Sequence, residues 1–147
     1  MSHGAPAAAI EHLKGGLVTV RQSPWLRTRP FGDALALATQ LGRTNTVAAA
    51  AFFSLLKKPF AVAALDEKCL ATRLALAHAL PPRDQVVAVD AFGPHFPWTL
   101  SFLEFRVQAF TAAGDPRSAE AQKDLAAHLA ATGTSFVDSV LSPLRPN

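Results

Sequence analysis

The chain has 147 residues, enough for one compact domain that buries roughly two thirds of its unfolded surface. Half of the residues are hydrophobic, 17% are charged, and the formal net charge is +3. The single cysteine, Cys69, excludes an intrachain disulfide and the zinc patterns that need two or more thiolates. The longest uninterrupted apolar run, residues 47–53, is too short for a membrane span, which needs about 20 residues. We therefore expect one domain over residues 1–147 and no integral membrane segment. The expected location is an intracellular, reducing compartment. The cytoplasm is preferred, and an organelle is the alternative.

The charge is distributed unevenly along the chain. The first 65 residues carry a net charge of +5, and the remaining 82 carry −2. Such asymmetry is typical of surfaces that bind nucleic acid, an acidic protein or anionic lipid headgroups. The alternative is that these sparse basic side chains are simply solvated.

The first 30 residues predict a short helix and an irregular connector. Pro6 to Lys14 has helical spacing, and Gly15 and Gly16 are expected to end that helix. Residues 17–20 are compatible with a brief extended segment. Residues 23–30 have proline at both ends, which disfavours helix in the preceding residue. This connector carries Trp25, Arg27 and Arg29.

Two further helices follow. Asp33 is expected to cap a helix that runs to about Leu41, and Gly42 is expected to turn the chain. Thr44 or Asn45 then caps a third helix, which is almost bare of polar side chains before two lysines at its end. A helix this apolar must be covered by the chain's own fold or by a partner.

The middle of the chain is less uniform. Leucines recur between residues 61 and 80 at a spacing that permits a helix of up to five turns, until Pro81 and Pro82 forbid continuation. Residues 85–92 are β-branched and too short for periodicity to choose between strand and helix, so an extended segment at 85–89 remains open.

The last third predicts a central aromatic helix and two peripheral ones. Pro97 is expected to begin the aromatic helix, which runs to about Ala113 and should bury most of its large side chains. Asp115 is expected to cap a charged helix ending at Gly133, with Leu125 and Leu129 facing inward. Residues 135–138 resemble a capping box for a short final helix. Together these elements predict an all-α orthogonal bundle of six to seven helices, and leave room for one or two short extended segments.

The search for chemical motifs is negative. There is no phosphate-binding glycine loop, no GxSxG, HExxH or CxxC pattern and no EF-hand spacing. His95 follows Asp90 by five residues, which would suit a general base oriented by a carboxylate, but a turn histidine is the simpler interpretation. We assign no catalytic residue, no metal site and no cofactor, and expect the chain not to be an enzyme.

The leading functional hypothesis is a non-catalytic helical protein that acts by docking to another protein. It would serve as an accessory subunit of a larger assembly or as an adaptor, and a homo-oligomer remains an alternative. Trp25, Arg27 and Arg29 are the preferred partner anchor, because tryptophan and arginine concentrate binding energy at interfaces. The opposing interpretation is that Trp25 packs on the chain's own core.

Two alternative functions belong to other classes. Residues 34–58 loosely resemble a helix-turn-helix, which would make the chain a DNA-binding regulator. The nucleic acid would be contacted by Arg43, Thr44, Asn45, Lys57 and Lys58. The second alternative is a small helical protein that binds an apolar ligand between aromatic side chains. The pocket would be lined by His95, Phe102, Phe105 and Phe110.

Overall fold

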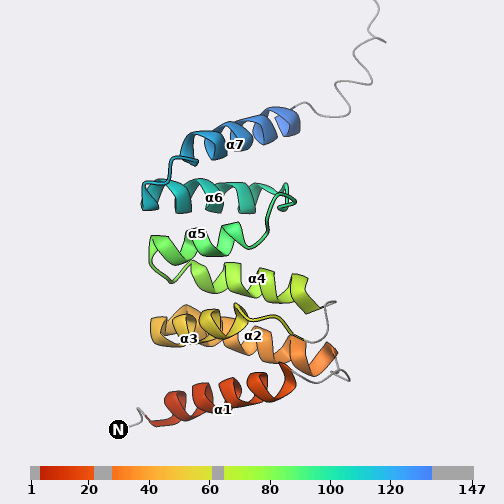
Figure 1. Cartoon of the computed structure of the whole chain (residues 1–147), viewed down its shortest axis with the longest axis vertical. Coiled ribbons are helices and arrows are strands. Elements are labelled where there is room, and N and C mark those ends of the chain that lie inside the picture. The colour runs from red at the N-terminus through yellow and green to blue at the C-terminus, as the bar shows by residue number, and fades with distance from the viewer. Residues whose placement is uncertain (1–3, 22–27, 61–64, 134–147) are drawn as a thin grey trace, which may run out of the picture. The chain divides into compact units, whose positions relative to one another are not determined.

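The computed structural model describes residues 4–21, 28–60 and 65–133 (Figure 1). All regular secondary structure in these ranges is helical, which confirms the predicted all-α bundle. The described helices are α1 (Gly4–Arg21), α2 (Thr28–Thr44), α3 (Thr46–Leu56), α4 (Asp66–Ala77), α5 (Pro82–Asp90), α6 (Leu100–Ala113) and α7 (Ser118–Gly133). The capping box expected at residues 135–138 and the short helix after it lie outside the described residues.

The chain divides into two compact units. Unit 1 comprises Met1–Ala91 and contains α1 to α5, and unit 2 comprises Phe92–Asn147 and contains α6 and α7. The expectation of one domain over residues 1–147 stays a prediction.

Within unit 1, the apolar helix α3 is covered by its own fold. It packs against α1, α2 and α4, which lie around it (Figure 1). Its side chains Phe52 and Phe53 are 0% and 2% exposed, so of the two alternatives left open by the sequence, cover by the chain's own fold accounts for most of this surface. Val47, at 75% exposure, is the large apolar side chain of α3 that remains in solvent.

The joint between α2 and α3 is a single capping residue. Asn45 has extended backbone, and its Oδ1 accepts a hydrogen bond from the backbone N–H of Ala48 at 3.0 Å. This bond satisfies one of the free amides of the first turn, so the predicted cap is confirmed at Asn45.

The first helix is longer than the sequence predicts. α1 continues through Gly15 and Gly16 to Arg21, so residues 17–20 are helical and the extended segment expected there was wrong. Leu17 is 1% exposed, and its burial against the neighbouring helices α2 and α3 offsets the cost of two helical glycines. α2 likewise begins before Asp33, at Thr28, and runs past Gly42 to Thr44.

Gly15→Ala and Gly16→Ala are each expected to raise the free energy of unfolding by about 1 kcal/mol, because alanine is the better helix former. A Cβ atom added at either position meets nothing within 4 Å, so no clash opposes this gain. Urea unfolding followed by circular dichroism measures the change. A loss of stability in both variants would contradict a continuous α1.

The undecided segment 85–89 also proves helical. Pro82 stands at the first position of α5, where its missing N–H costs nothing, and Asp84 places a carboxylate in the first turn. Ala88 and Val89 are buried, and the Gln85 side chain donates to the Leu80 carbonyl oxygen at 2.9 Å. Tertiary burial therefore outweighs the β preference of the valines.

Unit 2 is a helical pair built on aromatic packing. α6 begins at Leu100 rather than at Pro97, and Trp98 and Leu100 are 50% and 41% exposed instead of buried. α6 ends at Ala113 and is capped by Gly114, whose φ of 65° turns the chain so that the N–H of Asp115 donates to the Phe110 carbonyl oxygen at 2.9 Å. A stripe of polar residues at helical spacing along α6 is exposed. Its residues are Ser101, Glu104, Gln108 and Thr111.

α7 packs on α6 with an unexpected set of side chains. Ala121 is the fully buried residue of α7, Leu125 is half-buried, and Leu129 is 51% exposed, so the inward position predicted for Leu129 was wrong. The side chain of Asp124 on this face accepts a hydrogen bond from Nη1 of the buried Arg106. A polar contact between Arg106 and Asp124 therefore forms part of the α6–α7 interface.

Candidate functional site

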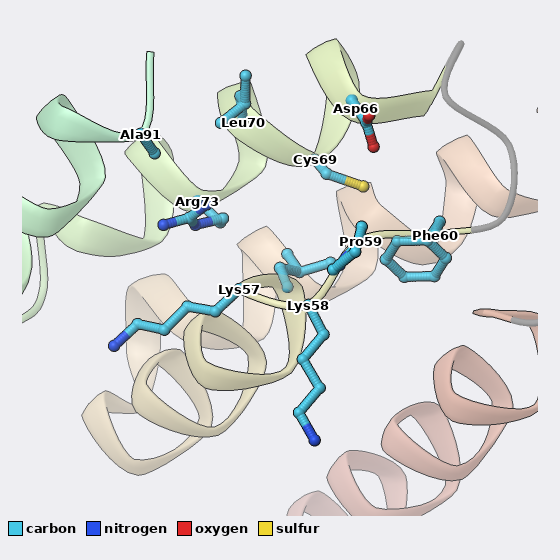
Figure 2. Close-up of a pocket in the computed structure, with 10 residues that line it drawn as sticks. Lys57, Lys58, Pro59, Phe60, Asp66, Cys69, Leu70, Arg73 and Ala91 are labelled. Atoms are coloured by element: carbon cyan, nitrogen blue, oxygen red, sulfur yellow. The ribbon is translucent and has the colours of Figure 1, made fainter. Parts of the chain in front are cut away.

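The pocket shown in Figure 2 lies in unit 1 and has a volume of about 250 Å³. One wall is the end of α3 and the segment after it, the opposite wall is α4, and Ala91 closes one side. The lining residues are Leu56, Lys57, Lys58, Pro59, Phe60, Asp66, Cys69, Leu70, Arg73 and Ala91.

The lining carries an excess of positive charge. It holds three cations, Lys57, Lys58 and Arg73, against one carboxylate, Asp66. The Nζ atom of Lys57 lies 3.6 Å from Oδ1 of Asp84 and 4.8 Å from the ring centroid of Phe53. Figure 2 shows the amino groups of both lysines reaching away from Cys69, so Arg73 is the cation held in the wall.

Arg73 is the least satisfied polar side chain of this wall. Its Nε is buried and has no hydrogen-bond partner, and its guanidinium lies 5.5 Å from the ring centroid of Phe53. Burial lowers the pKa of Arg73, since the charged form loses hydration there. An arginine remains a cation at neutral pH even so, and a buried unpaired donor costs about 1–3 kcal/mol.

A second guanidinium approaches the same region from α1. The Arg21 Nη2 donates to the Leu55 carbonyl oxygen at 2.6 Å, and its guanidinium lies 5.3 Å from the ring centroid of Phe60. Like that of Arg73, its Nε is buried without a partner. The region therefore contains two buried guanidinium donors whose acceptors are missing among the described residues.

Cys69 is a neutral member of the pocket. Burial, reinforced by the nearby Asp66, raises the pKa of its thiol to about 11, although Arg73 and Arg21 act in the opposite direction. At pH 7 the thiol therefore keeps its proton and adds no negative charge. Since the thiolate is the nucleophilic form, the arrangement does not suit covalent catalysis.

A second hollow, the α1–α2 groove, is almost entirely apolar. It has a volume of about 280 Å³ and is lined from both helices. The lining residues are His12, Leu13, Gly16, Leu17, Val20, Pro30, Phe31 and Ala34. Leu37, three residues after Ala34 on α2, is 46% exposed and extends the apolar face.

The preferred partner anchor is only partly within the described structure. Trp25 and Arg27 lie outside the described residues. Arg29 is exposed in the first turn of α2, next to the groove residue Pro30. The proposed role of these three residues in partner binding stays a prediction.

The predicted nucleic-acid residues lie at the two ends of α3. Arg43 and Thr44 are exposed at the end of α2, and the Asn45 side chain is occupied by its cap bond. Lys57 and Lys58 follow the opposite end of α3 and border the basic pocket. DNA binding through this set stays a prediction.

The aromatic residues predicted to line a ligand pocket form packed core. Phe102, Phe105 and Phe110 are 2%, 2% and 1% exposed, whereas His95 is exposed. The ring centroid of Phe102 lies 4.9 Å from that of Phe92, and Arg106 lies 5.5 Å from that of Phe110. The ligand hypothesis for these residues stays a prediction.

Sequence reasoning missed Arg21 and Arg73 as site residues. Arg73 is recognisable in the sequence only as a polar break beside the leucines of α4. Arg21 reaches Phe60 because α1 continues through its two glycines, which the sequence rules interpret as a stop.

Two structural features that would point to a function are absent from the described residues. Among residues 4–21, 28–60 and 65–133, no three His, Cys, Asp or Glu side chains form a group that could hold a metal ion. No described helix is both long enough and apolar enough to cross a membrane. Comparison with protein-family models, curated proteins and solved structures finds no match. The functional assignment therefore depends on the geometry of the two hollows.

Proposed function

We propose that the chain is a non-catalytic docking module, an accessory subunit or adaptor, that holds an amphipathic helix of a partner protein in the α1–α2 groove. The groove itself carries this proposal, because His12 is the one polar side chain among the residues that line it. Exposed apolar hollows of this kind are typical of helix-in-groove recognition.

The size of the groove favours side chains over a cofactor. Its volume of about 280 Å³ is below the roughly 300–1,000 Å³ of pockets for drug-sized ligands. Gly16 and Ala34 lack bulk on opposite walls, which leaves room for the apolar ridge of another helix. A row of leucines at positions i, i+3, i+4 and i+7 is the pattern that fits such a depression.

The net charge of the two helices that form the groove indicates which charges a partner helix would carry beside its apolar face. The described parts of α1 and α2 carry four basic residues against Glu11 and Asp33, a net charge of +2. The basic residues are Lys14, Arg21, Arg29 and Arg43. A partner helix with acidic residues flanking its apolar ridge would be attracted and oriented by this charge.

The test uses an amphipathic peptide of about 15 residues with leucines on one face and glutamates on the other. Binding to the full chain is followed by isothermal titration calorimetry and by amide shifts of α1 and α2. We expect saturable binding that Gly16→Leu weakens by about tenfold or more, since the new side chain fills the groove.

Gly15→Leu is the matched control. A Cβ atom added at Gly15 also meets nothing within 4 Å, but Gly15 does not line the groove. The Gly15→Leu variant should therefore bind the peptide with the affinity of the parent chain. Equal loss in both variants, or equal binding of a scrambled peptide, would contradict the proposal. Light scattering could instead show a dimer of the parent chain that Gly16→Leu dissociates. That result would identify a second copy as the occupant of the groove and would contradict the proposal of a different partner protein.

A further inference from the structure

The basic pocket of Figure 2 is a second site, lined by residues that the α1–α2 groove does not use. We propose that it binds a phosphate group, either free phosphate or that of a small phosphomonoester. The charge of the lining and the unpartnered Nε of Arg73 support this site, which is independent of the docking function.

Charge complementarity selects an anion of more than one charge. The lining has a net charge of +2, and the Arg21 guanidinium adds a further cation beside Phe60. A phosphate carries about −1.5 to −2 at pH 7 and presents three acceptor oxygens. The neutral thiol of Cys69 leaves this balance unchanged.

The donor geometry selects an oxyanion. Arg73 lines the pocket and its Nε–H is enclosed without an acceptor, so a small turn of the guanidinium toward the opening would let its fork donate two parallel hydrogen bonds to phosphate oxygens. The planar fork of Arg73 would define the position of the anion, and a longer, more flexible lysine side chain would turn toward it afterwards. The exposed Lys58 is the lysine best placed to do so, since Lys57 also faces Asp84.

The volume limits the ligand to a small molecule. About 250 Å³ accommodates a phosphate with a short organic group and is below the usual range for larger ligands. Phe60, Leu56 and Leu70 supply apolar surface for that group. We therefore expect glycerol 3-phosphate to bind at least as tightly as inorganic phosphate if the natural ligand is a phosphomonoester, and more weakly if it is free phosphate.

The experiment titrates the full chain with inorganic phosphate, glycerol 3-phosphate and succinate at constant low ionic strength. Calorimetry gives the affinities, and the ¹⁵N resonance of the Arg73 side-chain Nε reports the new hydrogen bond directly. We expect saturable phosphate binding and a shift of that resonance. Succinate binding as tight as that of phosphate would overturn the assignment of the ligand.

Three variants test which side chains of the lining set the affinity for phosphate. Arg73→Gln should weaken phosphate binding by about tenfold or more, since a hydrogen bond to a charged group is lost. Asp66→Asn should tighten binding, because it removes the one carboxylate of the lining. Arg73→Lys, which keeps the charge without the fork, should give an intermediate affinity.

Arg43→Gln is the charge-matched control. It removes one positive charge from an exposed position that does not line the pocket, so it should change the affinity by less than about twofold. If Arg43→Gln and Arg73→Gln weaken phosphate binding equally, the net charge of the protein explains the affinity. That result would overturn the proposal of a defined site. An unmoved Arg73 Nε resonance in the parent chain would overturn it as well, even if the Arg73 variants fail to fold.

Discussion

Replacing Asp124 by leucine is expected to lower the stability of the α6–α7 pair in unit 2 by about 3 kcal/mol or more. The Arg106 guanidinium donates to Asp124, and its side chain is 8% exposed, so the substitution leaves a buried cation without its counter-charge. The rings of Phe96 and Phe110 lie 4.6 Å and 5.5 Å from that cation and compensate only part of the loss.

A paired substitution distinguishes this cause from loss of packing. Arg106→Met with Asp124→Leu replaces both charges by apolar side chains, and should restore stability to about the parental level or above it. The measurement is hydrogen exchange of the α6 and α7 amides, which reports the opening of this pair. A double variant as unstable as Asp124→Leu alone would contradict the role assigned to the ion pair.

Replacing Gly42 by valine is expected to lower the free energy of unfolding of unit 1 by about 3 kcal/mol, the upper range for overpacking a core. Gly42 is buried inside α2. A Cβ atom at this position would overlap Cδ2 of Leu76 and lie 3.3 Å from the Cα of Ala49. α3 and α4 would both have to move away from α2, because the clash involves backbone as well as a side chain.

Gly32→Val on the same helix is the matched control, since a Cβ atom there meets nothing within 4 Å. Its expected change is within about 0.5 kcal/mol, the range for surface substitutions. Urea unfolding followed by circular dichroism compares the two variants. The double variant Gly42→Ala/Leu76→Ala should lose less stability than the two single changes together, and strict additivity would show that the two positions do not touch.

The basic pocket lies beyond what the sequence could predict. Lys57 and Lys58 are visible in the sequence as the end of an apolar helix, but they do not reveal that Arg73 shares their pocket. Arg73 belongs to a separate helix, and Arg21 approaches through its contact with Phe60, 39 positions later in the chain. Such sites are assembled by packing between helices, which local periodicity does not describe.

The sequence by itself determined the helical class, the cap at Asn45 and the end of the aromatic helix at Ala113, because each follows from hydrogen bonds and dihedral angles within a few residues. Tertiary structure decided whether the glycines of α1 and α2 end their helices or lie within them. Gly15 and Gly16 remain helical because burial of Leu17 favours α1 as a whole, and Gly42 is a point of close approach for α3 and α4. Glycine can therefore follow the end of one helix and lie inside another. The free energy that decides between these two outcomes comes from the burial of side chains distant in the chain.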